Sequence, residues 1–529
     1  MKKPSISIAK SKRISLPGAA TLLVMTMLVA QLLGFLRTTL VNGKFPLVGA
    51  NSTDVYFAAF KIPDFFFYVL AAGVLSVVLI PVLSEHMTKH DRKGVWQLSN
   101  SLMNLMAIIT FFVGIIILIF AEQLMHAVSP ILSPEQLSNA TTILRLIAFN
   151  PLFFTLSGIL TSTQQVFGRF FFFAITPIVY NLSIIASIFI FESSLGLVGL
   201  GVGALIGGVL QLLFAFIGVA GLGFHWRPVI DFKNVDFLRI LKQLPARSLD
   251  QGVDSVNSIV ETNRARFLGD GVLSSYENAF ILHTAPILLI GSSISTAAFP
   301  RLAERLANNR PDLFRKDFRE VLQVLMWIAM PIIVITYFCR GYLARLIFKR
   351  GSPEIALLLG FLAIAIFFRI TYTLLSRYFY AHKDTVTPLI ISVFAIALNI
   401  ILVFALARPD AYGIAGLAIA QSIVSASEVL IIGLVIAVRD PKLFNGDFWS
   451  MTTRLVSVTG FTIVSAFIMI TLLPLNLNDK GFFILGAKLG TITVVTFGVH
   501  IIISSLFGFD EGKNVLKKAR KLVYSVVKI

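Results

Sequence analysis

Residues 386–407 read VTPLIISVFAIALNIILVFALA, and this stretch contains no charged residue. A run of about 20 apolar residues is long enough, as an α-helix, to cross a hydrocarbon layer roughly 30 Å thick. Runs of this kind recur along the whole chain. Because only helices and closed barrels satisfy their backbone groups within lipid, and barrel strands are about ten residues long, the pattern predicts an all-α polytopic membrane protein.

The composition agrees with this prediction. Of the 529 residues, 56% are hydrophobic and 14% are charged, and the mean hydropathy is +0.85. Soluble domains contain about 25% charged residues. No segment between the apolar runs is long enough to form a soluble catalytic domain. The net charge of +18 lies in loops and tails. It therefore indicates membrane orientation and anionic membrane lipids as partners, and no nucleic acid.

Windowed hydropathy predicts fourteen membrane helices. Their approximate ranges are 20–41, 54–84, 97–121, 138–164, 171–193, 196–222, 236–265, 272–298, 320–345, 354–380, 386–407, 412–438, 450–474 and 482–507. Basic residues gather in the N-terminal tail, around Lys89 to Lys93, between Arg301 and Arg319, and after Lys513. By the positive-inside rule these segments, and hence both termini, are cytoplasmic.

The two halves of the chain resemble each other, and the matching motifs keep nearly the same separation. Tyr56-Phe57-Ala58-Ala59-Phe60 and Ile80-Pro81-Val82-Leu83-Ser84-Glu85 match Tyr276-Glu277-Asn278-Ala279-Phe280 and Phe299-Pro300-Arg301-Leu302-Ala303-Glu304. Six predicted helices separate the copies, so the two repeats share one orientation. Two parallel six-helix lobes plus a terminal helix pair are typical of a transporter with its substrate site between the lobes.

This repeat sets the predicted domain boundaries. They are a basic cytoplasmic tail at 1–19, an N-lobe at 20–222, a cytoplasmic linker at 223–235, a C-lobe at 236–438, a helix pair at 450–507 and a second basic tail at 508–529.

The helix predicted at 236–265 carries an unusual row of polar residues. Spacings of three and four place them within an arc of about 100° on one helix face; they are Arg247, Asp250, Asp254, Asn257, Glu261 and Arg264. A charge at the bilayer centre costs about 2.5–3.5 kcal/mol, so this stripe must face a partner or water. Two interpretations stay open, an ion-pair network with neighbouring helices and the wall of a hydrated cavity. The opposed charges allow both.

Further charged residues lie at membrane depth in other predicted helices. They are Arg37, Asp54, Lys61, Asp64, Arg145, Arg369 and Arg377. The planar guanidinium group can donate two hydrogen bonds to paired phosphate oxygens. We therefore expect an anionic, phosphate-bearing substrate bound by Arg37, Asp54, Lys61, Arg247, Arg264 and Arg369, with snorkelling near a helix end as the alternative for Arg145 and Arg377.

No zinc spacing, nucleophile elbow, phosphate loop or dinucleotide fingerprint occurs in a matching context, so we expect no enzyme, no catalytic residue, no metal site and no cofactor. His283 is a lone intramembrane histidine, for which a buried, hydrogen-bonded role is favoured over a proton relay.

Several motifs resemble the MviN/MurJ-like lipid II flippases of the MATE-related MOP exporter superfamily. They are Leu33-Gly34-Phe35-Leu36-Arg37, Thr53-Asp54-Val55-Tyr56-Phe57-Ala58-Ala59-Phe60-Lys61-Ile62-Pro63, the Ile80 to Glu85 stretch, Phe167-Gly168-Arg169-Phe170, Gly207-Gly208-Val209-Leu210-Gln211-Leu212 and Phe379 to Pro388. The chain departs from the family pattern at Gln31, Phe67, Tyr68, Ile281 and Thr284, where the family carries charged residues. We hypothesise that the charged stripe replaces some of these groups, as in a divergent flippase.

The resemblance implies transport of an undecaprenyl-diphosphate-linked peptidoglycan precursor, lipid II, across the cytoplasmic (inner) membrane of a bacterium by alternating access. It also implies a place in cell-wall biogenesis. No motif supplies ATP hydrolysis, so the energy would come from the membrane potential or from a sodium or proton gradient, with Asp250, Asp254, Asn257 and Glu261 as the coupling or cavity residues. Two other functions fit the same sequence: export of another polyprenyl-linked glycan or of drugs, and a non-transporting scaffold for cell-wall synthases.

Overall fold

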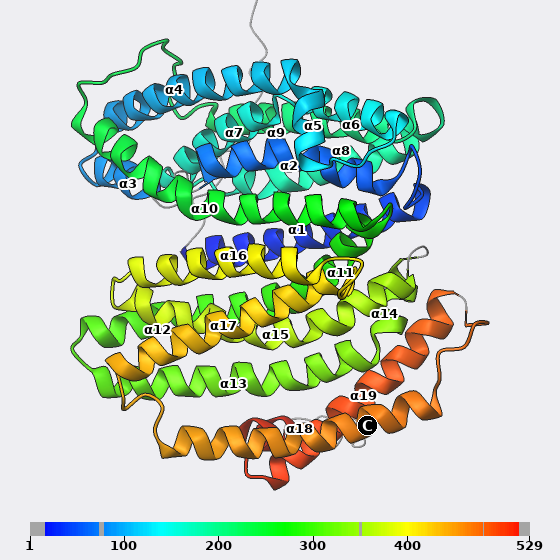
Figure 1. Cartoon of the computed structure of the whole chain (residues 1–529). Coiled ribbons are helices and arrows are strands. Elements are labelled where there is room, and N and C mark those ends of the chain that lie inside the picture. The colour runs from blue at the N-terminus through cyan, green and yellow to red at the C-terminus, as the bar shows by residue number, and fades with distance from the viewer. Residues whose placement is uncertain (1–15, 73–78, 349–351, 480, 518–529) are drawn as a thin grey trace, which may run out of the picture. The chain divides into compact units, whose positions relative to one another are not determined.

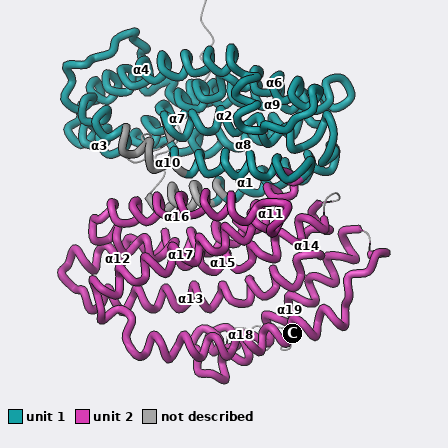
Figure 2. Tube along the Cα trace, viewed as in Figure 1, with its two compact units in different colours: residues 1–271 teal, residues 272–529 magenta. Residues whose placement is uncertain are grey.

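The computed structural model describes residues 16–72, 79–348, 352–479 and 481–517 (Figure 1). Every regular element within these ranges is helical. The chain divides into two compact units, residues 1–271 and 272–529 (Figure 2). This confirms the predicted fold class, an all-α membrane protein.

Unit 1 contains eleven elements within the described residues. They are α1 (Leu16–Lys44), α2 (Thr53–Phe67), the π-helical η1 (Tyr68–Ala72), α3 (Ile80–Thr88), α4 (Arg92–Ile119), α5 (Ala121–Val128), α6 (Pro134–Leu146), α7 (Asn150–Val166), α8 (Phe171–Leu195), α9 (Val198–Val219) and α10 (Val235–Leu268). The helix α10 packs against α2, α5 and η1. The boundary between compact units therefore falls after α10, whereas the predicted lobe boundary lies at 223–235, before it.

Unit 2 begins at α11 (Val272–Pro286) and the π-helical η3 (Ile287–Ser292). It continues with α12 (Ser293–Ala307), α13 (Pro311–Phe338), α14 (Arg340–Ile347), α15 (Ser352–Ala381), α16 (Val386–Leu406), α17 (Ala415–Arg439), α18 (Gly446–Leu472) and α19 (Phe482–Leu506).

The element order of unit 1 from α2 to α9 recurs in unit 2, except that the single helix α15 stands where unit 1 has α6 and α7. Both series run through a helix, a π-helical segment and a second helix, so that η1 corresponds to η3. The turns recur as well. Backbone φ is positive at His90 and at its counterpart Asn309, and again at Gly168 and at its counterpart Lys383. The recurrence of these elements and turns in both units supports the internal repeat.

The same hydrogen-bond pattern ends the helix before each of these four turns. At Gly168 the amide donates to the carbonyl of Gln165, and the next amide, that of Arg169, donates to Gln164. Lys383 and its neighbours repeat the pattern with Tyr380 and Phe379. This is the Schellman closure, in which a left-handed residue lets the last carbonyls of a helix find donors.

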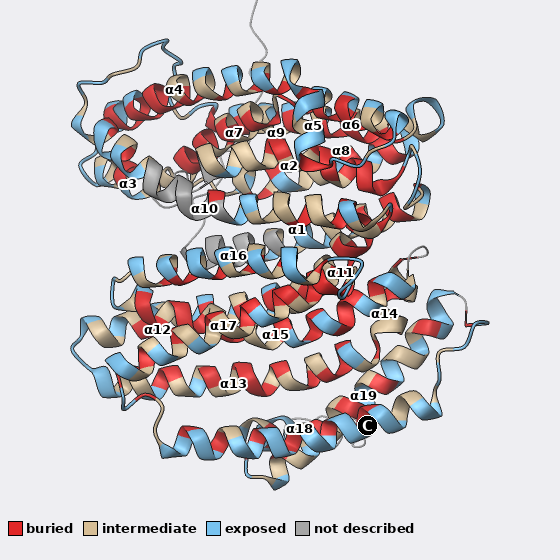
Figure 3. Cartoon of the chain, viewed as in Figure 1, coloured by how far each residue is buried: buried red, intermediate tan, exposed pale blue. Residues whose placement is uncertain are grey.

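The surface of α16 shows how the units meet their surroundings. Its exposed residues are large and apolar, including Ile390, Phe394, Ile401 and Phe404, and the opposite face is buried (Figure 3). Apolar side chains on an outer surface are stable in lipid, where no water has to be ordered around them. The outer surface of α16 therefore has the composition expected of a helix in contact with lipid.

Eleven helices in the described part of the chain are long and apolar enough to cross a membrane. The other three predicted spans fall on α1, on α2 to α3, and on α10. The helix α10 carries too many charged residues to qualify, and the other two adjoin segments outside the described residues. The chain is thus a multi-pass membrane protein, and the count of fourteen spans stays a prediction.

Candidate functional site

The polar stripe on α10 changes character along the helix. Asn234 caps the helix start, its side chain accepting from Asp236 and Phe237. The side chains of Arg247 and Asp250 lie outside the described residues. Beyond them Asp254 is exposed, Asn257 is half-buried and Glu261 is buried. Within the described residues, burial of the stripe therefore increases from Asp254 to Glu261.

The enclosed end of the stripe is held by contacts within unit 1. The Asn257 amide donates to Glu261 Oε1 at 3.1 Å. The guanidinium of Arg264 lies over the ring of Phe267 at 4.6 Å. On α2, the ammonium of Lys61 donates to the hydroxyl of Ser258 at 2.9 Å, so this predicted binding residue does face α10. The structure thus brings Lys61 beside the stripe.

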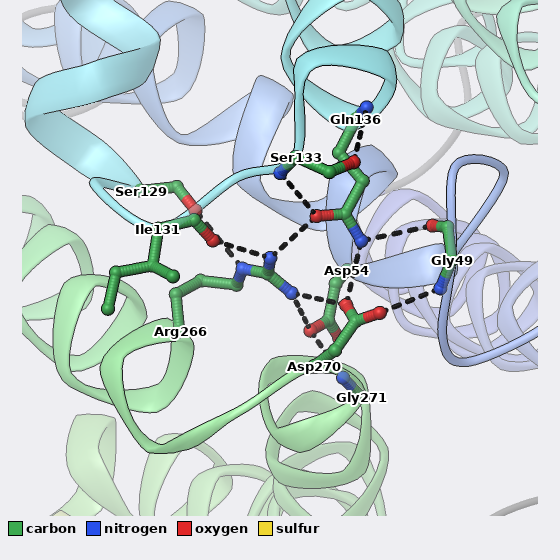
Figure 4. Close-up of polar contacts among 9 residues, drawn as sticks. All are labelled: Gly49, Asp54, Ser129, Ile131, Ser133, Gln136, Arg266, Asp270 and Gly271. Carbon is green, nitrogen blue, oxygen red and sulfur yellow. Dashed lines mark hydrogen bonds and ion pairs between the residues drawn. The ribbon is translucent and has the colours of Figure 1, made fainter.

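A second polar cluster surrounds Asp54 (Figure 4). Asp54 is fully buried and receives a hydrogen bond from Arg266 Nη1 at 2.6 Å and another from the Gly271 amide at 2.8 Å. Arg266 is 3% exposed. The predicted substrate contact of Asp54 stays a prediction, and what the geometry displays is an internal ion pair between α2 and α10.

Arg266 satisfies all of its five N–H donors. Nε donates to Ser129 at 3.1 Å, Nη1 also donates to Asp270 at 2.7 Å, and Nη2 donates to the carbonyl of Ile131 at 2.9 Å and to Gln136 at 3.1 Å. An arginine offers five donors in a rigid fork. We call this set, Asp54, Ser129, Ile131, Gln136, Arg266 and Asp270, the Arg266 hub.

The hub extends to the turn before α2. Asp270 Oδ2 accepts from the Gly49 amide at 2.7 Å, and Gln136 donates both to the Gly49 carbonyl at 3.1 Å and to Asp270 at 2.9 Å. Gln136 itself belongs to a capping box with Ser133 that starts α6. The hub therefore joins the turn before α2, the start of α2, the segment between α5 and α6, and the end of α10.

Sequence reasoning missed Arg266, Asp270 and Gln136. Arg266 follows Arg264 by two positions, which rotates it about 200° away from the stripe. Arg266 could have been found from two features of the sequence. Asp54 lies at membrane depth and therefore needs a cation, and Arg266 and Asp270 have the i,i+4 spacing of an ion pair.

Arg37, on α1, contrasts with these paired charges. Its side chain is half-buried, and its Nε is buried and lacks a hydrogen-bond partner. Within the part of the chain that the structure describes, Arg37 forms no hydrogen bond or ion pair. A guanidinium in this condition is available to an anionic ligand.

Unit 2 contains the last predicted binding residue, Arg369 on α15. Its Nη1 donates to Glu428 at 2.8 Å and its Nη2 to Gln421 at 3.3 Å, both on α17. Glu428 is buried, whereas the Arg369 side chain is 31% exposed. Glu428 was not predicted, although a single acid within the apolar span 415–438 has few ways to be accommodated other than pairing.

His283 is buried in α11, and neither ring nitrogen has a hydrogen-bond partner within the described residues. The hydrogen-bonded role favoured from the sequence is therefore wrong for this structure. The ring of Phe280 lies 5.3 Å from the imidazole. The described residues also contain no group of three or more His, Cys, Asp or Glu side chains that could hold a metal ion.

The turn between α15 and α16 explains one of the motifs. Asp384 accepts hydrogen bonds from the amides of Val386 and Thr387, from the Thr387 hydroxyl and from Arg439. The Thr387 amide and then the Arg439 guanidinium hold the pKa of Asp384 well below its usual range. The motif around Asp384 therefore caps α16 and ties it to the end of α17.

Comparisons with known proteins give consistent results. A family model described as Lipid II flippase MurJ matches residues 46–487. The chain is 25% identical over 433 residues to a probable lipid II flippase MurJ of Borreliella burgdorferi, covering 80% of this chain and 84% of that protein. It is 28% identical over 384 residues to one of Buchnera aphidicola subsp. Baizongia pistaciae, covering 70% and 74%.

Two solved structures share the fold. One is described as lipid II flippase MurJ in an inward closed conformation, with a TM-score of 0.75 and 22% identity over 92% of this chain and 98% of that one. The other is an inward-facing multidrug resistance MATE family transporter of the MOP superfamily, with a TM-score of 0.65 and 14% identity over 80% and 99%.

Proposed function

The chain belongs to the lipid II flippase MurJ family, and we propose that it moves lipid II from the inner to the outer leaflet of the bacterial cytoplasmic membrane by alternating access. The family match over residues 46–487 is the observation that carries this proposal. Lipid II is a polyprenyl-diphosphate-linked saccharide, so the protein must offer cations to its diphosphate while the prenyl chain remains in lipid. Transport of this kind requires no covalent chemistry on the substrate.

Arg37 is the residue to which we assign the diphosphate. It is half-buried on α1 and forms no ion pair within the described residues, so its charge is not already neutralised. Its fork can donate two parallel hydrogen bonds to phosphate oxygens. Lys61 and Arg264, both in unit 1, supply further positive charge near the stripe. We propose that they assist Arg37.

Arg369 has a different part in the proposal. Because Glu428 and Gln421 already accept from it, Arg369 can bind the substrate only if it leaves Glu428. Separating a buried carboxylate from its cation is unfavourable unless another cation replaces it. We therefore propose that Arg369 contributes to substrate binding in one conformation of the cycle rather than in all of them.

The polar stripe supports both interpretations that the sequence left open. Asp254 is exposed and Glu261 is buried, so one end can face water while the other is enclosed. Asp250, Asp254, Asn257 and Glu261 remain the proposed residues for sodium or proton coupling. Transport measured in sodium-free liposomes with and without an imposed voltage tests this: full activity without voltage or sodium would leave a proton gradient as the source.

The experiment that tests the function is lipid II flipping by the purified chain in liposomes. We expect Arg37→Gln to abolish most transport and Arg37→Lys to retain part of it, because an ammonium keeps the charge but not the fork. Arg145→Gln is the matched control, since Arg145 is exposed and the variant loses the same charge. Equal flipping by the Arg37 and Arg145 variants would refute the assignment.

The same assay separates the other candidate functions. Parallel liposomes carrying a different polyprenyl diphosphate saccharide show whether the head group is selected. If the chain moves that lipid and leaves lipid II in place, it is an exporter of another glycan. If it moves neither, while cells lacking it still flip lipid II and misplace their cell-wall synthases, it acts as a scaffold.

A further inference from the structure

The segment between α9 and α10 is held firmly although it forms no regular element. It runs along α4 (Figure 1), whose side chains bind its backbone. Asn100 donates to the carbonyl of His225 at 3.0 Å, and Asn104 donates to the carbonyls of Arg227 at 2.6 Å and Val229 at 3.0 Å. Buried or interfacial backbone groups need such partners. The conformation of residues 220–234 is therefore fixed by α4.

This fixed segment exposes large apolar side chains. Trp226, Val229 and Phe232 are 59%, 56% and 55% exposed. The indole N–H of Trp226 donates to Asn104 at 2.9 Å, which sets the direction of the ring. The segment starts directly after α9, one of the apolar helices able to cross a membrane. Tryptophan is enriched at this depth, where its ring contacts lipid and its N–H stays hydrogen-bonded.

A pocket lies at the base of the segment. It has a volume of about 310 Å³, and Phe216, Val219 and Phe224 form its apolar wall. Positive φ angles at Gly221 and Gly223 turn the chain around it. The Phe224 ring lies 5.2 Å from that of Trp96, so an aromatic cluster backs the pocket. Ligand pockets range over roughly 300–1,000 Å³, so this one accommodates part of a chain-like ligand.

Basic side chains surround the pocket and the exposed apolar residues. Arg169 donates to the carbonyls of Gly218 and Ala220, and Arg92 lies 6.0 Å from the ring of Phe167, which stacks on Trp96. Arg227 and Lys233 are exposed. None of these four cations forms an ion pair with any residue that the structure describes. Of the acids nearby, Asp236 is paired with His86 and Glu85 with Arg239, and Asp231, within the segment itself, accepts a hydrogen bond from the Lys233 amide.

We propose that residues 216–233, together with Arg92 and Arg169, bind an anionic phospholipid. Part of an acyl chain enters the pocket against Phe216 and Phe224, and the phosphate lies among Arg169, Arg227 and Lys233. Trp226 and Phe232 rest in the boundary layer around it. The site is confined to unit 1 and does not depend on the proposed transport of lipid II.

The test uses the full-length chain in nanodiscs that contain brominated lipid, which quenches nearby tryptophan. The signal of Trp226 is the difference between the parent and Trp226→Phe. We expect a brominated anionic phosphatidylglycerol to quench this signal several-fold more than equally brominated phosphatidylcholine, since each basic side chain near an anionic surface raises association about fivefold. Arg227→Gln with Lys233→Gln should bring the ratio close to one.

Two controls make the result decisive. Lys89→Gln with Lys93→Gln removes the same charge from exposed positions on another turn and should leave the ratio unchanged. Ala220→Phe, which places a ring in the pocket, should lower the amount of phosphatidylglycerol that co-purifies, as counted by native mass spectrometry. Equal quenching by both lipids, no quenching by either, an equal effect of the two double variants, or unchanged lipid retention in Ala220→Phe would each overturn the proposal.

Discussion

The two units hold equivalent positions with different chemistry. Arg169 in unit 1 and Asp384 in unit 2 each follow the left-handed residue of a matching turn. Arg169 donates to carbonyls at the end of α9, whereas Asp384 accepts from Arg439 at the end of α17. The two turns share their backbone geometry, but the turn residue donates hydrogen bonds in unit 1 and accepts them in unit 2. The repeat thus preserves a connection between two helix ends without preserving the side chains that make it.

The buried charges of the two units differ in the same instructive way. The Arg266 hub gathers helix ends and turns, and its arginine is 3% exposed with every donor used. The Arg369 and Glu428 pair joins the middle of two helices, and its arginine side chain is 31% exposed. Desolvated charges are strongly committed to their partners, whereas a partly hydrated one can exchange them. The hub is therefore suited to holding helix ends in one arrangement, and the Arg369 and Glu428 pair to exchanging partners.

The largest expected effect is at the hub. Arg266→Met removes the cation and leaves Asp54 charged and buried, which should cost about 3–5 kcal/mol of stability. Asp54→Asn in the same background should restore part of the loss, because an amide is less costly to bury than a carboxylate. Apparent melting temperatures of the purified variants measure both. If Arg266→Met melts together with the Arg145→Met control, the hub does not stabilise unit 1.

A smaller loss is expected at the pair in unit 2. Glu428→Gln replaces a charged acceptor with a neutral one, and Arg369 can compensate through water, so we expect a cost of about 1.5–3 kcal/mol. Glu354→Gln is the control because Glu354 is exposed on the same helix as Arg369. Unfolding of the two variants by denaturant compares them. A loss as large as that at the hub would contradict the idea that Arg369 can exchange partners.

The inverted turns predict different responses to pH. The pKa of Asp384 is lowered in the folded chain, so its contribution is complete above the unfolded value of about 3.9 and disappears as pH falls through the folded value. Asp384→Asn should therefore cost about 1 kcal/mol at neutral pH, the usual value of a helix cap, and progressively less in acid.

Arg169→Gln is the counterpart in unit 1. A guanidinium does not titrate in this range, so the loss that this variant causes should be independent of pH. Melting temperatures measured from neutral to acidic pH compare the two variants. Parallel curves for Asp384→Asn and Arg169→Gln would show that the Asp384 charge is not used.

The smallest effects concern the left-handed turn residues. Lys383 adopts φ of 62°, where a side chain is strained, and Gly168 adopts φ of 77° in the matching turn. Lys383→Gly should stabilise by at most about 1 kcal/mol, since relief of strain is offset by the flexibility of glycine in the unfolded chain. Gly168→Ala should destabilise by a similar amount. A Cβ at Gly168 meets no atom within 4 Å, so the loss of stability in Gly168→Ala comes from the backbone conformation alone. Changes of the same sign would contradict this account.

Much of the architecture could be predicted because it depends on local patterns. Apolar runs predict helices wherever the chain crosses lipid, and repeated motifs reveal the repeat from the sequence alone. The helix α10 was also predicted, although its charges exclude it from the apolar spans. What could not be predicted was which unit it packs with, since hydropathy carries no information on the partner of a helix.

The site was harder to predict because the partner of a charged residue depends on the three-dimensional packing of the helices. Lys61 was predicted from its depth and Arg264 from its place on the stripe, but Ser258 as the partner of Lys61 emerges only when α2 and α10 lie together. The hub draws on a turn, a segment between helices and a helix end, none of which has the periodicity that revealed the stripe. The charged residues of the stripe were thus found from their regular spacing, whereas isolated charges on helices, such as Arg266 and Glu428, and partners in turns were missed.

The recurrent π-helical segments have a mechanical consequence. A π turn contains one residue more than an α turn, and such bulges are uncommon outside functional regions. The segment η3 therefore holds about one extra residue directly ahead of α12, and η1 holds one directly after α2. If the π turn moved along the helix, the side chains it passed would rotate about the helix axis by about 100°, while both ends of the helix stayed in place. Each repeat thus contains a place where a helix can re-aim a row of side chains without unfolding.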